Sequence, residues 1–229
     1  MSSPEVRGTL DVGDRRVSVA WVQPGEPGEP APVLVVAHGA GAGMDHPFLA
    51  GFCRALVAHG IGTMRFNFPY VEAGRRAPDS EAVLRQAWLA AFGAATARAD
   101  DGRAVLAGGK SLGGRIASMC VADGMPAAGL VFLGYPLHPP GRPERIRDEH
   151  LHRIRVPMLF LQGTADPFAR PDLLEPVLAK LGDLATHVRV AGGDHSFNVK
   201  GSRQDPRDMG ASLARLAAPF ILRVAGKAR

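Results

Sequence analysis

The sequence has little cysteine and no long hydrophobic run. Its 229 residues include two cysteines, Cys53 and Cys120, and both fall in apolar segments of helical pattern. A thiol in such a segment usually behaves as a small buried hydrophobe, so we expect neither to form a disulfide. No segment approaches the roughly 18 unbroken apolar residues of a membrane span, and the first 16 residues lack the apolar run of a secretory signal. These absences favour a cytoplasmic protein with no membrane partner.

The sequence also lacks a concentrated basic patch, although its formal net charge is +5 and its pI is about 9.8. Basic and acidic residues are interleaved, whereas a nucleic-acid site gathers lysine and arginine on one face. We interpret the densest basic stretch as a solvated face and expect no nucleic-acid partner; phosphate binding there is the lesser alternative. That stretch mixes five arginines with three acids: Arg142, Arg145, Arg147, Arg153 and Arg155 with Glu144, Asp148 and Glu149.

Apolar residues are present in the amount that one core needs. Hydrophobic residues make up 46% of the chain and charged residues 21%, both close to globular averages. Chains of this length with helices around a sheet often form one unit, and the sequence has no internal repeat or low-complexity tract. We therefore expect residues 1–229 to form a single domain.

Short apolar runs alternate with segments of helical period, after an N-terminal hairpin. Val6–Val12 and Arg16–Val22 alternate in polarity around Gly13 and Asp14, which is typical of a β-hairpin. A loop rich in proline and glycine, residues 24–32, follows. The pattern then predicts strands over 33–38, 62–68, 103–109, 128–135, 157–163 and 186–192, and helices over 47–59, 80–98, 111–123, 172–181 and 209–224. This alternation predicts an α/β fold with a mostly parallel sheet and helices on both faces.

A GxSxG motif, Gly109-Lys110-Ser111-Leu112-Gly113, lies between a predicted strand and a predicted helix. Catalytic groups in an open parallel sheet gather beyond the carboxyl ends of its strands, where this motif falls. Serine in the motif sits on a strained turn that needs small residues two positions away on both sides. The alternative is a glycine-rich turn in which Ser111 caps the helix. A Walker-type phosphate loop is excluded, because Ala104 stands where its first glycine is required.

Two further strand ends supply a carboxylate and an imidazole, Asp166 and His195. A serine hydroxyl needs a histidine to take its proton, and the histidine needs a carboxylate to fix its tautomer. The chain order Ser111, Asp166, His195 is the order that α/β-hydrolases use. The alternatives are a turn role for Asp166 and a structural role for His195. We interpret the neighbouring Asp194 as a residue that braces the loop.

The first parallel strand ends in a glycine-rich segment, His38-Gly39-Ala40-Gly41-Ala42-Gly43. Repeated glycines leave backbone N–H groups free to point at a developing oxyanion, and we predict the amides of Ala40 and Leu112 as its donors. His38 is expected to brace this loop by hydrogen bonds. A dinucleotide-binding loop is disfavoured, because no GxGxxG motif opens a helix here.

Together these motifs resemble the small α/β-hydrolases related to dienelactone hydrolases, in particular a subgroup that includes an animal chromatin-complex subunit and a testis-expressed protein. The resemblance runs from about Val33 to the C-terminus and rests on HGAGAGMDHPF, MRFNFPY, GGKSLGGRIAS, LGYPLHPPGRPE, LFLQGTADPF and GGDHSF. It implies an eight-stranded core with little or no lid, and it maps nucleophile, acid and base to Ser111, Asp166 and His195. Dienelactone hydrolases proper use a cysteine nucleophile where this chain has Ser111, so their substrate is not carried over.

Analogy of position within that family places further side chains near the site. Residues 135–157 are the only segment long enough for a cap, and they read as a loop with a short helix, which predicts an open site. Phe66 and Phe92 are predicted core residues. The predicted substrate-binding residues are Gly39, Lys110, Tyr70, Tyr135 and His138, with Phe68, Arg115 and Phe168 also near the rim.

These features predict a serine hydrolase of the carboxylesterase kind, which cleaves an ester or related acyl bond through an acyl-enzyme. Ser111 attacks, His195 moves the proton and Asp166 orients the ring. The expected partner is a small-molecule acyl substrate, no metal or organic cofactor is implied, and the chain is expected to be a monomer or a homodimer. The alternative is a catalytically silent binding or scaffold protein on the α/β-hydrolase fold.

Overall fold

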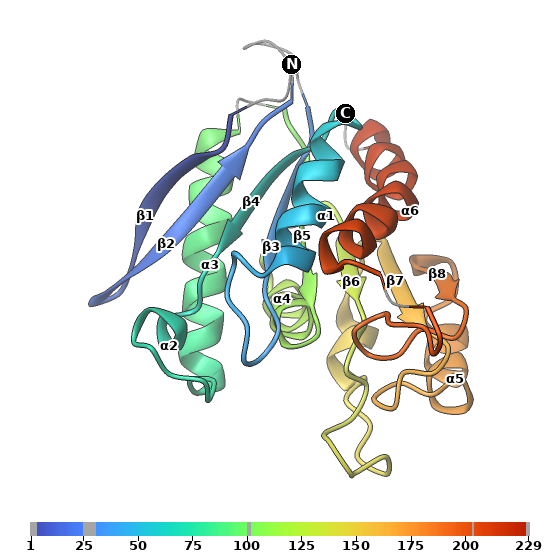
Figure 1. The fold of residues 1–229 in the computed structure, drawn as a ribbon. Coiled ribbons are helices and arrows are strands. Elements are labelled where there is room, and N and C mark those ends of the chain that lie inside the picture. Colours follow the sequence, from blue (N-terminus) through green and yellow to red (C-terminus); the bar gives the residue numbers. More distant parts are fainter. Residues whose placement is uncertain (1–3, 25–30, 100–101, 203, 228–229) are drawn as a thin grey trace.

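Eight strands form one sheet in the computed structural model, which describes residues 4–24, 31–99, 102–202 and 204–227. Most of the predicted proline- and glycine-rich loop lies outside the described residues. The strands are β1 (Val6–Val12), β2 (Arg15–Val22), β3 (Val33–Ala37), β4 (Gly62–Phe66), β5 (Val105–Lys110), β6 (Leu130–Leu133), β7 (Met158–Gly163) and β8 (Ala185–Val190). Their order across the sheet is β1-β2-β4-β3-β5-β6-β7-β8 (Figure 1).

The sheet is mixed, with an antiparallel hairpin at one edge. β1 pairs with β2, and β2 pairs with β4, both in the antiparallel sense. All the pairings from β4 across β3 to β8 are parallel. This arrangement confirms the predicted hairpin and the six predicted parallel strands. The strand predicted over 128–135 is shorter, because Gly134 adopts φ +71° and turns the chain after Leu133.

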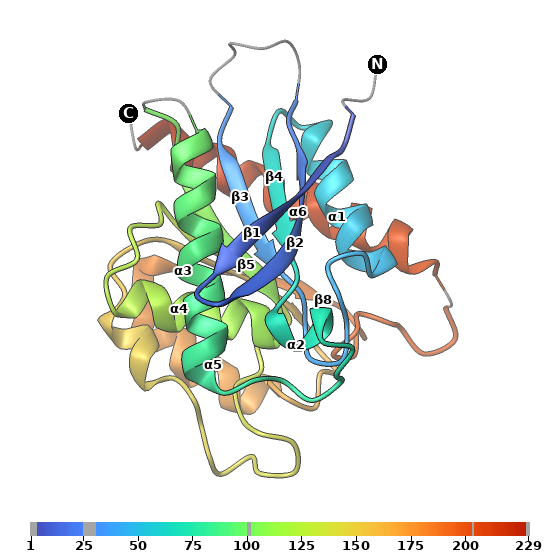
Figure 2. The ribbon, with the colours of Figure 1, turned by 90° about the vertical axis from the view of Figure 1, so that its left-hand side faces the viewer.

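Helices cover both faces of the sheet. Viewed from the hairpin edge, Figure 2 shows α3 on one side of the strands and α1 on the other. One face carries α1 (Pro47–Val57) and α6 (Pro206–Lys227), and the other carries α3 (Glu81–Arg98), α4 (Leu112–Ala122) and α5 (Pro171–Leu181). Three short helices complete the elements: α2 (Pro69–Glu72), η1 (Glu149–Arg153) and η2 (Gly182–Leu184).

The alternation of side chains in β3 explains why its sequence is an unbroken apolar run. Val33 and Val35 belong to the core under α3 and α4, whereas Leu34 and Val36 belong to the core under α1 and α6. A strand between two helical layers has no polar face, so every position favours an apolar residue. Both cysteines are buried free thiols in these cores, as predicted.

The segment between β6 and β7 does not form a cap domain. It contains η1 and otherwise runs as a loop that Figure 1 shows extending beyond the sheet. This agrees with the predicted loop and short helix over residues 135–157, and it leaves the carboxyl ends of β3, β5 and β7 without a lid.

The contact between α1 and α6 is close enough to require glycine. A Cβ built on Gly210 of α6 would lie 2.1 Å from the Phe48 carbonyl oxygen of α1, and one on Gly51 would lie 2.4 Å from the Arg207 carbonyl oxygen. By length and composition α6 is the one helix of the described residues that could cross a membrane, and half of its apolar window is buried in this fold. Packing against α1 accounts for those apolar side chains.

We expect Gly210→Ala to lower the free energy of unfolding by about 1–3 kcal/mol, because the added methyl group forces α1 and α6 apart. Gly93→Ala is the matched control: Gly93 lies in α3 with nothing within 4 Å of its Cβ position. This control is expected to raise the free energy of unfolding by about 0.5–1 kcal/mol, since alanine favours a helix over glycine. Urea unfolding followed by circular dichroism measures both, and an increase for Gly210→Ala would contradict the close packing.

Candidate active site

Ser111 lies on a strained turn between β5 and α4. Its backbone has φ +49° and ψ −114°, a region that side-chain-bearing residues rarely occupy. The Ser111 amide donates a hydrogen bond to the Leu133 carbonyl of the neighbouring strand. Its side chain makes no capping bond to α4, so the turn presents the hydroxyl group instead of capping the helix.

The glycines around Ser111 are required by the approach of this turn to the end of β3. A Cβ on Gly109 would lie 2.5 Å from the Ala37 carbonyl oxygen, and one on Gly113 would lie 2.4 Å from the same oxygen. Contacts this short exclude any side chain. The two glycines of the motif are therefore needed for a tight turn, as the sequence predicts.

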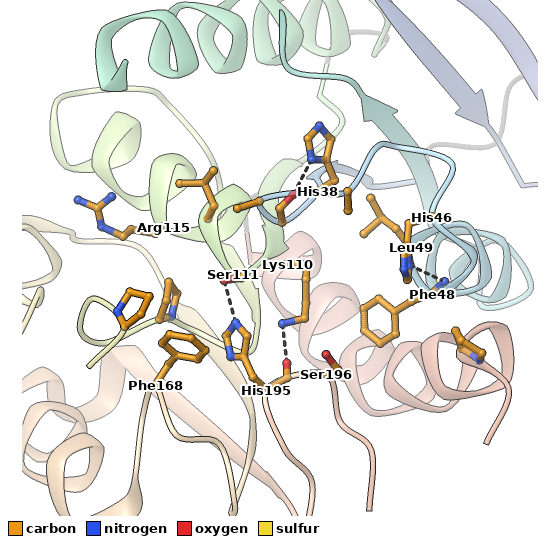
Figure 3. Close-up of a pocket in the computed structure, with 18 of the residues that line it drawn as sticks. His38, His46, Phe48, Leu49, Lys110, Ser111, Arg115, Phe168, His195 and Ser196 are labelled. Carbon is orange, nitrogen blue, oxygen red and sulfur yellow. Dashed lines mark hydrogen bonds between the residues drawn. The ribbon is translucent and has the colours of Figure 1, made fainter. Parts of the chain in front are cut away.

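A chain of hydrogen bonds joins Ser111, His195 and Asp166. Ser111 Oγ lies 2.8 Å from His195 Nε2 (Figure 3), and His195 Nδ1 lies 2.7 Å from Asp166 Oδ2. The carboxylate is fully buried and also accepts hydrogen bonds from the Gln162 side chain and the Phe168 amide. These partners hold Asp166 with one oxygen toward Nδ1, which leaves Nε2 free to accept from the serine hydroxyl.

The His195 loop is held by its own aspartate. Asp194 Oδ1 accepts hydrogen bonds from the amides of Ser196 and Asn198, both at 2.8 Å. Asp194 therefore braces the loop, as the sequence predicts. Phe197 adopts φ +67° inside this turn, and its buried ring stacks on Phe48 of α1 at a centroid distance of 5.8 Å.

Lys110 connects the serine turn to the histidine loop. Its ammonium group donates to the His195 carbonyl oxygen at 2.6 Å and lies 5.6 Å from the centre of the Phe197 ring. Burial lowers the pKa of Lys110 to about 8, although the charges of Asp166 and Asp194 act to raise it. Lys110 is thus a predicted site residue whose observed contact is with the loop that carries His195.

The backbone amides of Ala40 and Leu112 have no hydrogen-bond partner among the described residues. Both residues line the pocket beside Ser111. His38 shapes the loop of Ala40: its Nδ1–H donates to the Gly39 carbonyl at 2.8 Å, and its Nε2 accepts from the Phe68 amide at 3.1 Å. Burial lowers the pKa of His38 to about 4, so the ring stays neutral and keeps this bracing role.

A pocket of about 670 Å³ opens at Ser111 and His195. It includes the predicted site residues Gly39, Lys110 and His138, together with Arg115 and Phe168 of the predicted rim. Side chains from the start of α1 and α6 complete it, and the sequence does not identify them because they read as helix core or cap. These additional lining residues include His46, Phe48, Leu49, Pro206 and Met209.

Tyr70 and Tyr135 are corrections to the predicted substrate-binding set, since neither lines the pocket. Tyr70 is fully buried, and its hydroxyl lies 3.4 Å from the Gly39 carbonyl. Tyr135 is 1% exposed and donates to the Arg147 carbonyl at 2.8 Å. Both side chains point into the core, and their hydroxyl groups contact backbone carbonyls of the loops that carry Gly39 and Arg147. Phe68, predicted at the rim, is buried as well.

Arg147 lines the pocket although the sequence did not predict it there. We interpreted its stretch as a solvated face, and the neighbouring Arg142 and Arg145 are indeed exposed. Arg147 instead is half-buried and lines the pocket.

The described residues contain no group of three or more histidine, cysteine, aspartate or glutamate side chains that could hold a metal ion.

The sequence profile of the alpha/beta hydrolase domain matches residues 30–221. The chain belongs to this family. Solved structures agree with the assignment of the fold. A dienelactone hydrolase from Anabaena variabilis superposes with a TM-score of 0.76 at 18% identity, over 97% of this chain and 99% of that chain.

Two further solved structures show the same fold. A serine hydrolase without lid from Xanthomonas campestris has a TM-score of 0.73 at 21% identity, over 96% of this chain and 94% of that chain. A cold-adapted esterase from an Arctic intertidal metagenomic library has a TM-score of 0.68 at 17% identity, with the same two coverages. The family and the fold confirm the coarser part of the sequence resemblance.

The choice of Asp166 over Asp194 as the partner of His195 predicts a spectroscopic difference. A proton held between His195 Nδ1 and a buried carboxylate should give a resolved downfield proton resonance, because the bond is short and shielded from water. We expect Asp166→Ala to abolish that resonance. Asp194→Asn is the control, since its amide oxygen still accepts from the loop amides, and it should retain the signal; the opposite pattern would contradict the assignment.

The lowered pKa of Lys110 predicts a dependence of stability on pH. The unfolded chain holds this proton up to about pH 10.5, whereas the folded protein releases it near pH 8. Between these values the unfolded state binds more protons, so the free energy of unfolding contributed by Lys110 rises with pH. The free energy of unfolding of the native protein should therefore rise relative to that of Lys110→Met from pH 8 to 10.5; a constant difference would contradict the lowered pKa.

Proposed function

We propose that the protein is a serine hydrolase that cleaves an ester or a related acyl bond, with Ser111 as nucleophile, His195 as base and Asp166 as the orienting acid. The observation that carries this proposal is the unbroken chain of hydrogen bonds from Ser111 Oγ through His195 to a buried carboxylate. A serine hydroxyl becomes an effective nucleophile when an oriented imidazole accepts its proton.

The geometry supports a two-step acyl transfer. Ser111 Oγ forms a bond to the carbonyl carbon while its proton passes to His195 Nε2, and Asp166 stabilises the resulting imidazolium. The amides of Ala40 and Leu112 then donate to the oxyanion, for which they are free in the structure. Collapse of this intermediate breaks the bond to the alcohol oxygen, which takes the proton from Nε2. Water repeats the sequence on the acyl-enzyme and releases the acid.

One comparison supports a serine nucleophile and another supports an ester as the bond attacked. The Xanthomonas structure is described as a serine hydrolase without lid, and the metagenomic protein as an esterase. The sequence resemblance adds a finer assignment, to the dienelactone-hydrolase-related subgroup, which we include in the proposal. Because no cap covers the pocket, the proposed substrate is a small acyl compound that enters directly from solvent.

Replacement of Ser111 by alanine tests the proposal. We expect Ser111→Ala to reduce the hydrolysis of short p-nitrophenyl esters by about 10⁴-fold or more, because the three side chains act as a unit. A fluorophosphonate probe should label the native protein and not the variant. Intact mass measurement after labelling identifies the modified protein.

Ser196→Ala is the matched control, since Ser196 also lines the pocket but its hydroxyl is not bonded to the His195 ring. It should keep both labelling and turnover. Folded native protein that neither labels nor hydrolyses any ester of the series would contradict the proposal and would favour a binding or scaffold role for the fold.

A further inference from the structure

The pocket at Ser111 has an unbalanced charge. Three cationic side chains line it, Lys110, Arg115 and Arg147, and none of its described lining residues is aspartate or glutamate. Lys110 is bonded to the His195 carbonyl. The two arginines therefore supply the cationic groups that no step of the proposed acyl transfer uses.

Arg115 and the apolar pair Phe48 and Leu49 lie on opposite sides of the reacting groups. Figure 3 shows Arg115 and Phe168 on one side of Ser111 and His195, with Phe48 and Leu49 on the other. A compound bound across Ser111 would meet a guanidinium group at one end and hydrocarbon at the other.

Arg115 is held in the pocket with unused hydrogen-bonding capacity. It lies one turn beyond Ser111 in α4, its side chain is 17% exposed, and its Nε is buried without a hydrogen-bond partner. The acidic group that approaches it is Glu81, at 3.6 Å from its terminal nitrogen, too far for a hydrogen bond. A planar guanidinium in this state can still bind an oxyanion through two parallel N–H groups.

Arg147 lines the same pocket from the loop between β6 and β7, and the charge of Arg115 acts on it. The Tyr135 hydroxyl fixes its backbone carbonyl at 2.8 Å, and no carboxylate of the described residues forms an ion pair with its guanidinium. Burial lowers its pKa, and the charge of Arg115 lowers it further. An anion between the two arginines would relieve both effects.

The neighbouring groups do not fully neutralise the two arginines. Burial and the charges of Arg115 and Arg153 lower the pKa of His150 to about 4, so His150 is neutral at physiological pH. Glu81 lies 3.6 Å from Arg115 and also 3.6 Å from Arg85, so its charge is shared, and none of the described carboxylates forms an ion pair with Arg147. A carboxylate, with one negative charge and two oxygens in one plane, fits the paired N–H groups of a guanidinium.

His138 adds a polar atom beside the same end. Its Nδ1–H donates to the Pro139 carbonyl at 2.9 Å, whereas its Nε2 is buried without a hydrogen-bond partner among the described residues. The His138 ring lies 6.3 Å from that of Phe168, which in turn lies 4.5 Å from the His195 ring. A buried polar atom without a partner costs free energy that a bound polar group recovers.

We propose that the substrate is an ester that carries a separate carboxylate group, which Arg115 and Arg147 bind while an apolar part lies against Phe48 and Leu49. The word substrate rests on the serine hydrolase function proposed above. The carboxylate site itself is a property of the pocket and can be tested by binding.

Two matched pairs of esters test the proposal by turnover. Mono-p-nitrophenyl glutarate against p-nitrophenyl pentanoate places the charge on the acyl side, and 3-acetoxybenzoate against its methyl ester places it on the leaving group. We expect the carboxylate member of at least one pair to have a kcat/KM about 10- to 100-fold higher, the effect of a charge-assisted hydrogen bond. The pair that responds identifies the side of the ester that faces the arginines.

Arginine variants test which side chains cause the preference for the carboxylate-bearing ester. Arg115→Gln and Arg147→Gln should each lower the ratio of the two kcat/KM values by about tenfold, and Arg145→Gln, an exposed arginine of the same loop, should leave the ratio unchanged. Circular dichroism checks that each variant is folded. Hydrolysis of the neutral esters with no preference for either carboxylate member would overturn the inference and leave the proposed function standing.

Binding to Ser111→Ala separates the two proposals. Calorimetry should detect monomethyl glutarate binding that is tighter than methyl pentanoate binding and that is lost when Arg147→Gln is added. That result together with no turnover by the native protein would support the carboxylate site and reject the hydrolase function. No binding of monomethyl glutarate and no carboxylate preference in turnover would overturn the inference.

Discussion

The close approach of the β5–α4 turn to the end of β3 is the constraint on which the site depends. The Ala37 carbonyl oxygen occupies the space that a side chain at Gly109 or Gly113 would need. This contact accompanies the strained backbone of Ser111, and the same turn lies against Gly39, whose Cβ position is 3.6 Å from the Ser111 Cβ. Because Lys110 precedes the serine, the same turn also reaches across to the His195 carbonyl. One turn thus carries the nucleophile, the free amide of Leu112 and the tether of the histidine loop.

Backbone strain is confined to the two sides of the Ser111–His195 contact. Ser111 and Phe197 are the non-glycine residues with positive φ in the part of the chain that the structure describes. Such conformations persist where surrounding contacts determine them more than once. Phe197 is buried and stacked on Phe48, whose helix packs on α6 through contacts that exclude a Cβ at Gly210. The helical layer behind the sheet therefore supports the position of the histidine.

The sequence predicts the elements and the meeting of the three polar residues, because both follow from rules that local sequence carries. Strand ends in a parallel sheet share one edge, so Ser111, Asp166 and His195 are brought together by topology. The sequence does not predict the direction in which a side chain points after its strand ends, because that direction depends on the curvature of the loop. Tyr70 and Tyr135 follow strands as the reactive residues do, yet both turn into the core. Phe48 and Leu49 lie in a helix and yet line the pocket. Apolar residues recur with the same helical spacing whether they face a sheet or a pocket, so the sequence does not distinguish the two.

The excess of positive charge has a structural distribution that composition cannot reveal. Most arginines near carboxylates are paired at the surface, as Arg7 is with Asp45 and Arg189 is with Glu175. Exposed pairs of this kind contribute little to stability. Arg115 and Arg147 differ, because both are partly withdrawn from water and the one ion pair that the described residues offer them is that of Arg115 with Glu81, at 3.6 Å. Folding places the remaining desolvation cost beside the serine, and the carboxylate proposed above would recover part of it on binding.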